Sequence, residues 1–258
     1  MSGYTRDEMM TVAASRLLQD GQVCFVGIGL PSAACNLARL THAPGLVLIY
    51  ESGTIGTRPQ VLPLSIGDGE LAETAVCVVP LPEIFSDYLQ AGRIDIGFLG
   101  AAQIDRHGNL NSTVIGSYDR PRTRLPGAGG ATEIAAHAGE VFIVMKATPR
   151  SFVPKLDFQT SGGHFAGRAQ SGAKGRGPCV VVTDVGILRP RAPDGELMLA
   201  ATYPGIAVGD ARAAIGWPLA VVAKPESVAP PTAAELETLR ALQLRTEAAH
   251  REPVRLPT

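Results

Sequence analysis

The chain has 258 residues, of which 45% are hydrophobic and 18% charged, so it can bury a large core and is not a disordered chain. Its net charge of -1 speaks against nucleic acid or an acidic membrane surface as a partner. No apolar stretch approaches the ~20 residues needed to span a bilayer, and the N-terminal residues lack the order of a signal peptide. We therefore expect a cytoplasmic protein that binds neither nucleic acid nor membrane.

The first elements along the chain predict a βαβ unit. Residues 5–20 have the pattern of a helix, with a capping box at their start and an apolar residue at every fourth position. A strand over 22–26, the loop "GIGLP", a helix over 32–40 and a strand over 45–50 follow in that order. Because two strands joined through a helix pair in parallel, we expect a parallel sheet.

The same alternation continues toward the C-terminus. The pattern predicts helices over 82–92 and 233–251, a glycine-rich loop leading into a helix over 127–138, and strands over 94–100, 141–145, 179–184 and 197–203. Residues 160–178 form a glycine-rich loop, which in a compact domain is either a functional flap or a disordered stretch. No repeat or linker divides the chain. We therefore expect residues 1–258 to form a single α/β domain, with an open, mainly parallel sheet flanked by helices and a C-terminal helix and tail over 232–258.

Several of the predicted strands end in loops that could bind a ligand. Open α/β sheets bind ligands outside the carboxyl ends of their strands. The run "VLIY" ends at Glu51, and Gly27, Gly29, Gln103 and the approach to "GAGGA" follow other strands. We expect these loops to converge on one crevice.

Familiar nucleotide and hydrolase motifs fit this sequence poorly. "FVGIGLPS" has two glycines of a dinucleotide-binding turn, with Glu51 near the spacing of a ribose-binding acid, but Ser32 replaces the third glycine. Gly167 and Gly172 have the spacing of a nucleotide-triphosphate loop, but Ala173 takes the place of its lysine. No G-x-S-x-G segment supports a serine hydrolase. A dinucleotide-dependent oxidoreductase stays open as the weaker alternative.

Cysteine and histidine spacing supports neither a disulfide framework nor a metal site. Cys24, Cys35, Cys77 and Cys179 show no paired spacing and stand in apolar segments, so we expect reduced thiols in the core. The five histidines form no HxxxH or HExxH pattern, and we expect no metal.

Glu51 is suited to nucleophilic chemistry. A glutamate carboxylate is already ionised at neutral pH and needs no general base, and its natural targets are activated acyl groups. The small neighbours Ser52, Gly53 and Gly56 would leave room for a bulky thioester. The segment "GAGGATEIAAHA" leads a glycine loop into a helix, and its backbone N–H groups could stabilise the negative charge that forms.

Four motifs together resemble the B (β) subunits of family I CoA-transferases, among them those of the 3-oxoadipate and glutaconate enzymes. The motifs are "VGIGLP", "YESGTIG", "LGAAQIDRHGNLNST" and "RLPGAGGATEIA", and the similarity is dense over residues 6–160. One departure lies further on. "GRAQSGAKGRGP" is shorter than the corresponding segment of the relatives and lacks its Leu-Gly-Leu-Pro-Gly run.

The resemblance implies that Glu51 is the nucleophile of a covalent reaction. Coenzyme A (CoA) would be substrate and covalent intermediate, with no permanently bound cofactor. CoA would move from succinyl-CoA to 3-oxoadipate, a small dicarboxylic acid of aromatic compound catabolism. An A (α) subunit would complete the site in an α2β2 heterotetramer. A glutaconate-type transferase and a CoA-ester hydrolase of the same fold are the alternatives, and Glu51 argues against the hydrolase because such relatives lack the motif glutamate.

The resemblance also implies roles for the glycine loops. Gly127, Gly129 and Gly130 would form the oxyanion and substrate loop, with a backbone donor at one of the last two. The residues that could line the rest of the site are Gly27, Gly29, Ser52, Gly53 and Gln103. For Gln103 a structural hydrogen bond is the equal alternative.

Overall fold

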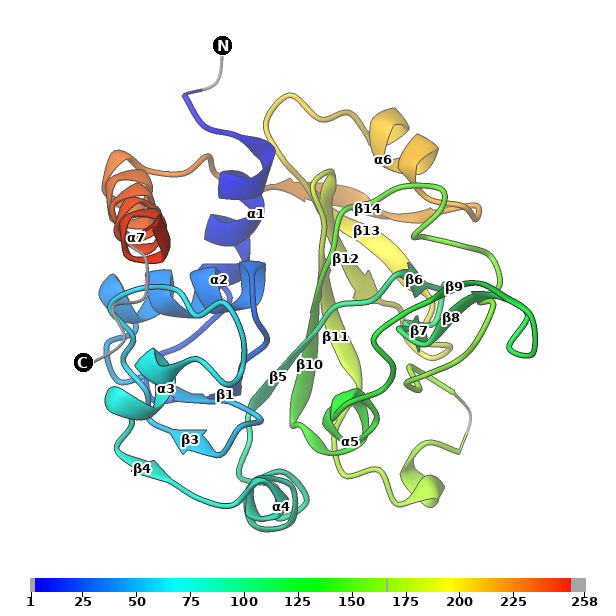
Figure 1. The fold of residues 1–258 in the computed structure, drawn as a ribbon. Helices are drawn as coiled ribbons and strands as arrows, with labels where there is room; N and C mark the ends of the chain where they lie inside the picture. The colour runs from blue at the N-terminus through cyan, green and yellow to red at the C-terminus, as the bar shows by residue number, and fades with distance from the viewer. Residues whose placement is uncertain (1–2, 166, 252–258) are drawn as a thin grey trace.

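A computed structural model describes residues 3–165 and 167–251, and its centre is a mixed sheet of ten strands (Figure 1). The strand order is β14-β13-β12-β11-β10-β5-β1-β2-β3-β4. The bounds are β1 Val23–Phe25, β2 Val47–Ile49, β3 Thr54–Ile55, β4 Cys77–Val78, β5 Ile96–Leu99, β10 Glu140–Val144, β11 Pro178–Val182, β12 Gly186–Pro190, β13 Leu197–Thr202 and β14 Ala220–Ser227. The run of strands from β11 to β2 is parallel, and the antiparallel pairs lie toward the edges. The expected α/β fold with a mainly parallel sheet is confirmed.

Helices cover both faces of this sheet. Their bounds are α1 Arg6–Ser15, α2 Leu30–Leu40, α3 Gly69–Glu73, α4 Leu81–Glu83, the π-helical turn η1 Ile84–Leu89, α5 Ala131–His137, the 3-10 turn η2 Ala169–Ser171, α6 Val208–Ala214 and α7 Ala233–Arg251. Figure 1 shows α1, α2 and α7 together on one side of the central strands and α5 on the other. Two short ribbons stand apart from the main sheet: β6 Gln103–Ile104 with β7 Leu110–Asn111, and β8 Val114–Gly116 with β9 Pro121–Arg124.

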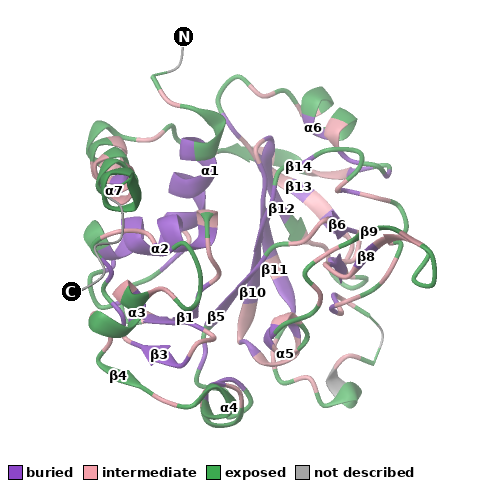
Figure 2. Ribbon diagram, viewed as in Figure 1, coloured by how far each residue is buried: buried purple, intermediate pink, exposed green. Residues whose placement is uncertain are grey.

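Strand β10 shows how the sheet is held between two apolar layers. Val141 and Ile143 belong to one buried cluster, whereas Phe142 and Val144 belong to the other. Successive side chains of a strand point to opposite faces, so both faces of β10 are covered. The central strands are accordingly buried in Figure 2. A continuous apolar run such as "VFIV" is typical of a parallel strand between two layers of helices.

The close approach of α5 to the sheet depends on a glycine in β5. A Cβ on Gly97 would stand 2.5 Å from the side chain of Ile134, in the middle of α5, and 2.8 Å from that of Ala138, the residue that follows the helix. Such contacts are too short for real atoms. The missing side chain therefore lets α5 lie directly on β5, which fixes the loop that precedes the helix.

The first helix begins as predicted and ends earlier. The Thr5 hydroxyl accepts a hydrogen bond from the N–H of Glu8 (3.1 Å), and the Glu8 carboxylate accepts one from the N–H of Thr5 (2.6 Å). This capping box confirms the predicted start. The helix ends at Ser15, because the N–H groups of Leu17 and Leu18 bond to carbonyls only three residues back and tighten the chain.

Other predicted elements differ in detail. The helix expected over 82–92 consists of one α-helical turn followed by a π-helical turn, and it stops before Gly92 (φ 75°). The helix expected over 233–251 is α7, with those bounds. The tail that was predicted to follow it, residues 252–258, lies outside the described residues.

The prediction that all four cysteines lie in the core is wrong for Cys77. Cys24 and Cys35 are buried, and burial raises the pKa of the Cys35 thiol well above its ordinary value. Cys179 is half-buried and Cys77 is exposed. Cys77 belongs to β4, which lies at the edge of the sheet and pairs with β3 alone, so one side of the strand has no neighbouring strand.

The described part of the glycine-rich segment 160–178 packs against α5 and the start of β11. The Arg168 guanidinium donates hydrogen bonds to the carbonyl oxygens of Ala135 and Gly163, and the His164 ring pairs with the carbonyl of Pro178 at 2.6 Å. These contacts attach the described part of the segment to the end of α5 and to the start of β11.

Candidate active site

Glu51 stands in the tight turn between β2 and β3. The N–H of Gly53 donates to the carbonyl of Tyr50 (3.0 Å), and the N–H of Tyr50 donates to the carbonyl of Thr54 (3.1 Å), so the chain reverses around Glu51 and Ser52. Tyr50 is fully buried, and its hydroxyl lies 2.9 Å from the hydroxyl of Ser32 in α2. Burial raises the pKa of the Tyr50 phenol. The apolar strand therefore ends at Tyr50, whose position is fixed by burial, and the side chain of Glu51 projects from the end of the sheet.

Gly53 is required by the geometry of this turn. Its φ of 105° is one that side-chain-bearing residues rarely adopt, and a Cβ there would stand 2.0 Å from the carbonyl oxygen of Val79. The N–H of Val79 in turn donates to the carbonyl of Gly53 (3.0 Å). The segment after β4 therefore lies against the turn and supports it from behind.

The second component of the site is the glycine loop before α5. The N–H of Gly127 donates to the carbonyl of Ser112 (2.8 Å), and the Ser112 hydroxyl donates to the carbonyl of Gly127 (2.7 Å). This pair of bonds fixes the start of the loop. The backbone N–H groups of Gly129 and Gly130 form no hydrogen bond with described residues and remain available as donors.

Turn and loop meet at the Glu51 carboxylate. A Cβ on Gly129 would stand 3.9 Å and 4.0 Å from the two carboxylate oxygens, and a Cβ on Gly130 would stand 3.3 Å from the carboxyl carbon. The same Cβ on Gly130 would stand 2.7 Å from the ring of Phe85. Phe85 comes from η1 and packs on Phe25 with ring centroids 6.0 Å apart. The carboxylate thus faces glycine backbone on one side.

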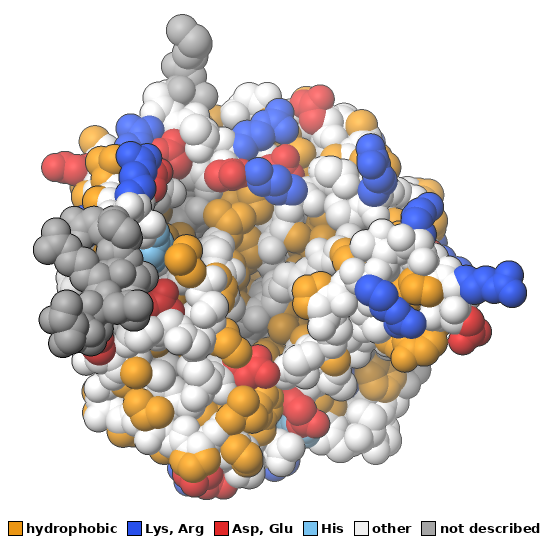
Figure 3. Space-filling view, in the orientation of Figure 1, with side chains coloured by type: hydrophobic (Ala, Val, Ile, Leu, Met, Phe, Trp, Pro, Cys, Tyr) orange, Lys and Arg blue, Asp and Glu red, His pale blue; other side chains and the backbone are white. Residues whose placement is uncertain are grey.

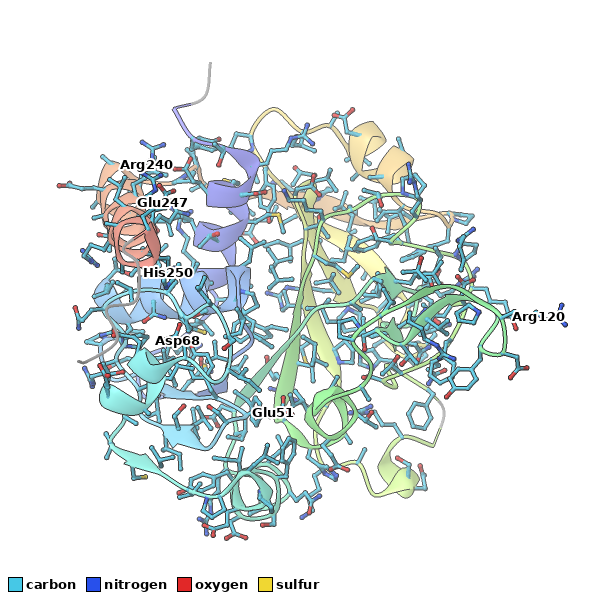
Figure 4. The ribbon with its side chains drawn as sticks, viewed as in Figure 1. Glu51, Asp68, Arg120, Arg240, Glu247 and His250 are labelled. Atoms are coloured by element: carbon cyan, nitrogen blue, oxygen red, sulfur yellow. The ribbon has the colours of Figure 1, made fainter. Side chains whose placement is uncertain are left out.

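A cavity of about 580 Å³ opens beside this contact. Its walls come from the carboxyl ends of β1, β5 and β10, the start of α2, the Glu51 turn and the glycine loop. Among the described residues that line it, Glu51 has the single ionisable side chain, and the other lining side chains are apolar or absent. Figure 3 shows a hollow bordered by hydrophobic side chains in the middle of this face, and Figure 4 places Glu51 beside α5 in the same region.

The Glu51 carboxylate has no charged neighbour to neutralise it. No hydrogen bond or ion pair joins this side chain to another described residue. The side chain is half-buried at the wall of the cavity. An unpaired carboxylate in a mostly apolar cavity is free to bond to an electrophilic carbon, because no internal partner has to be displaced first.

The structure brings some of the expected site residues together and separates others. Gly27, Gly127, Gly129 and Gly130 line the cavity with Glu51. The other three expected positions are not among its lining residues: Gly29 is the N-cap of α2 with φ 85°, Gly53 closes the turn, and the Ser52 hydroxyl is buried without a hydrogen-bond partner among the described residues.

Gln103 lies in a different cavity. Its side-chain oxygen accepts from the Asn111 amide (2.7 Å) and from the N–H of Asp157 (3.1 Å), and its amide donates to the Asp157 carboxylate (3.2 Å). With 6% of its surface exposed, Gln103 joins β6, β7 and the 151–158 segment. The sequence left two roles open for Gln103, lining the site or making a structural hydrogen bond. In the structure it makes the hydrogen bonds given above, and the residues that line the Glu51 cavity do not include it.

Two residues beside Glu51 and its loop were not anticipated from the sequence. Phe85 was part of a predicted helix, where an apolar residue signals a core position and nothing more. Ser112 belongs to the "NLNST" turn, whose small polar residues are typical of any loop. Both act on the glycine loop from segments distant along the chain, and a single sequence carries no signal for such contacts.

The part of the chain that the structure describes has no side-chain cluster suited to a metal ion and no helix suited to cross a membrane. Within residues 3–165 and 167–251, no three His, Cys, Asp or Glu side chains are grouped so as to hold a metal ion. Nor is any helix of these residues both long and apolar enough to cross a bilayer.

Comparison with known proteins places the chain among enzymes that handle CoA. A family model described as coenzyme A transferase matches residues 7–212. The chain is 57% identical over 253 residues to the B subunit of the 3-oxoadipate CoA-transferase of Pseudomonas knackmussii, with 97% of each chain covered. It is 26% identical over 242 residues to the cholesterol ring-cleaving hydrolase IpdB subunit of Mycobacterium tuberculosis, covering 92% of this chain and 94% of that one.

A solved structure shares the fold over nearly the whole chain. The structure of glutaconate coenzyme A-transferase from Acidaminococcus fermentans superposes with a TM-score of 0.86 and 35% identity. The superposition covers 93% of this chain and 94% of that chain.

Proposed function

This chain belongs to the coenzyme A transferase family, and we propose that it is the B subunit of an enzyme that transfers CoA from succinyl-CoA to 3-oxoadipate, with Glu51 as the nucleophile. The observation that carries the assignment of Glu51 is its geometry. Its carboxylate is unpaired, lies at the wall of a mostly apolar cavity and faces the backbone of Gly129 and Gly130.

The first step forms an anhydride. A Glu51 carboxylate oxygen attacks the thioester carbonyl carbon of succinyl-CoA, the carbon–sulfur bond breaks, and CoA leaves as a thiolate. The oxyanion that forms on the carbonyl needs hydrogen-bond donors in a fixed position. The free N–H groups of Gly129 and Gly130 belong to the loop that lies against the Glu51 carboxylate, and Ser112 and α5 hold this loop in place, so we infer that they are the donors.

The later steps move CoA onto the acceptor. The thiolate attacks the Glu51 carbonyl carbon of the anhydride and releases succinate, which leaves a Glu51–CoA thioester. A carboxylate oxygen of 3-oxoadipate then attacks this thioester, and the thiolate leaves again. Finally the thiolate attacks the acceptor's carbonyl carbon of the new anhydride, which gives 3-oxoadipyl-CoA and restores the Glu51 carboxylate. No proton or electron is gained or lost over the cycle.

The apolar wall protects both intermediates. Anhydride and thioester are hydrolysed if water reaches them, so a transferase needs a dry site around Glu51. Side chains such as Phe25, Leu99 and Ile134 line the cavity and offer water no hydrogen bond. A hydrolase of the same fold would instead have to position a water at the acyl carbon, and the described lining side chains include no polar group besides Glu51 that could hold one.

The choice of acceptor rests on the relatives. The 57% identical protein is named for 3-oxoadipate, and a further relative, 37% identical over 237 residues, is named for glutaconate. Both are named as B subunits, so an A subunit is the implied partner. We propose an α2β2 assembly, action in aromatic compound catabolism and a cytoplasmic location. A glutaconate-type acceptor is the second candidate.

The proposal is tested by measuring the mass of the Glu51 peptide with mass spectrometry. The complex with the A subunit is mixed with succinyl-CoA in the absence of acceptor, quenched in acid and digested. The peptide that contains Glu51 should carry CoA in thioester linkage, and adding 3-oxoadipate before the quench should discharge it. An unmodified peptide in an enzyme that turns over would overturn the covalent mechanism, and Glu51→Gln is the matched control.

A further inference from the structure

The loop between β3 and α3 contributes one side chain to the Glu51 cavity. Ile66 alone among the described residues 52–97 lines this cavity, and 39% of its surface is exposed to solvent. Phe25 and Leu99 line the same cavity with 2% and 7% of their surface exposed. Ile66 therefore touches both the cavity and the solvent, which places it at the mouth, whereas Phe25 and Leu99 belong to the interior.

Hydrogen bonds attach the first half of this loop to two helices. The Arg39 guanidinium in α2 donates to the carbonyl of Pro59 (2.9 Å). The N–H of Leu62 donates to the Thr246 hydroxyl in α7 (2.8 Å). The chain that leads to Ile66 is therefore held against the body of the protein.

A tight turn fixes the tip of the loop. The Asp68 carboxylate accepts hydrogen bonds from the N–H groups of Leu64 (3.0 Å) and Glu70 (3.2 Å), so it closes the turn and caps α3 at the same time. The N–H of Asp68 donates to the carbonyl of Ser65 (3.2 Å). Ile66 is therefore presented at the mouth of the cavity from a fixed backbone.

The core of this chain does not require an isoleucine at position 66. Leu71 of α3 is fully buried and belongs to one of the core clusters, whereas Ile66 belongs to no buried cluster of the described residues. Small polar residues and glycine are the ordinary occupants of such a turn. The apolar surface of Ile66 is useful at the mouth of the cavity, because it offers water no hydrogen bond there.

Water that enters at the mouth would divert the reaction. The Glu51–CoA thioester waits for an acid acceptor, and water competes with that acceptor for the acyl carbon. The water oxygen attacks the Glu51 carbonyl carbon and the carbon–sulfur bond breaks. One proton of the water passes to the leaving thiolate and the other to solvent, which gives free CoA and restores the Glu51 carboxylate. Because succinate has already left, the sum is hydrolysis of succinyl-CoA.

We propose that Ile66 is a specificity-determining residue, which keeps water from the Glu51–CoA thioester and so sets the ratio of CoA transfer to hydrolysis. The inference rests on the proposed transferase function, because it needs the covalent intermediate on Glu51. It assigns to one side chain at the mouth a task that the buried walls of the cavity cannot perform, since solvent reaches the cavity through its mouth.

The test measures two rates on the complex with the A subunit. One is the release of CoA thiol from succinyl-CoA without acceptor, and the other is the formation of 3-oxoadipyl-CoA with 3-oxoadipate present. Ile66→Ser should raise the first rate about tenfold and change the second by less than about twofold. The Glu51–CoA adduct, followed by mass spectrometry, should decay about tenfold faster in this variant. Ile66→Val keeps a branched apolar side chain and should hydrolyse succinyl-CoA within about twofold of the unaltered rate.

Leu64→Ser is the matched control, because Leu64 belongs to the same loop, has 67% of its surface exposed and is not among the residues that line the cavity. It should leave the rate of hydrolysis unchanged. Unchanged hydrolysis in Ile66→Ser, or an equal rise in Leu64→Ser, would overturn the proposal. Weaker association of Ile66→Ser with the A subunit in sedimentation would also overturn it, because the residue would then be a subunit contact. An unaltered enzyme that turns over without a Glu51–CoA adduct would refute the covalent mechanism itself, so the two failures are told apart.

Discussion

A methyl group on Gly130 would stand 3.3 Å from the carboxyl carbon of Glu51 and 2.7 Å from the ring of Phe85. The backbone of Gly130 is held between a nucleophile candidate and an aromatic ring, and its φ of -80° is open to any residue. The constraint at this position is therefore one of space and not of backbone conformation.

Gly130→Ala tests how closely the loop must approach Glu51. The new Cβ has to displace the Phe85 ring from Phe25 or push the loop away, and a displacement near 1 Å should lower kcat by about 100-fold. Crowding should also destabilise the fold by about 1–3 kcal/mol. Steady-state kinetics and urea unfolding measure the two effects.

The control for this variant is Gly209→Ala in α6, where a Cβ would meet nothing within 4 Å. It should leave kcat unchanged. Phe85→Leu combined with Gly130→Ala should recover part of the lost rate, because the smaller side chain makes room. Full activity in Gly130→Ala alone would show that the contact is not needed.

Part of this arrangement could be predicted from the sequence because it follows from local signals. The run "VLIY" predicts a strand that ends at Glu51, and parallel topology predicts that loops after such strands meet at one edge of the sheet. The glycine loop before α5 is equally visible. Glu51 and Gly129 do lie together, although 78 positions separate them in the sequence.

The remainder depends on contacts that leave no periodic trace. The strands β6 and β7 have two residues each, too few for alternation to show. Their pairing places Gln103 beside Asn111, away from the lining of the Glu51 cavity. The position of Phe85 depends on a π-helical turn, and helical periodicity gives the wrong face for such a turn.

Replacing Glu51 separates a catalytic role from a structural one. Glu51→Gln keeps the shape but removes the nucleophile, and it should lower kcat on the order of 10⁴-fold or more. Since Glu51 has no partner among the described residues, the free energy of unfolding, measured by thermal denaturation, should change by no more than about 0.5 kcal/mol. Glu51→Asp keeps a nucleophile set back by one methylene group and should lose about 100-fold in kcat. A Glu51→Gln enzyme whose kcat stays within about tenfold of that of the unaltered enzyme would exclude this residue as the nucleophile.

Ser112 should act on the reaction through the glycine loop. Ser112→Ala removes the hydrogen bond from its hydroxyl to the carbonyl of Gly127 and leaves the backbone bond between the two residues. Stability should fall by about 1 kcal/mol. The looser loop should lower kcat by about tenfold with little change in KM for succinyl-CoA, because donors made for the transition state are displaced. A change in KM alone would place Ser112 in ground-state binding instead.

The attachment of α7 to α1 should weaken in acid. Burial by itself would raise the pKa of the Glu235 carboxyl, but hydrogen bonds from Arg16 (2.7 Å to each carboxylate oxygen) and from Thr232 outweigh it and hold the pKa at about 2, below the ordinary 4.5. A hydrogen bond from Arg240 likewise lowers the pKa of Glu8 in α1. Because folding lowers both pKa values, both carboxylates contribute fully to stability above about pH 4.5, and the contribution of Glu235 is lost as the pH falls toward 2.

Glu235→Gln therefore makes a prediction with a definite sign. At neutral pH the variant should be about 1 kcal/mol less stable than the unaltered chain, since a partly exposed bidentate pair contributes modestly. The difference should shrink steadily between pH 4.5 and pH 2, where the unaltered carboxylate also becomes protonated. Hydrogen exchange of the α7 amides measures the release of the helix directly.

Glu237→Gln, on the exposed side of α7, is the matched control, and its difference in unfolding free energy from the unaltered chain should not vary with pH. A constant gap for Glu235→Gln over this range would mean that the Arg16 contact does not depend on the charge of Glu235, and the attachment of α7 would then have to come from its apolar contacts, such as the buried Leu239.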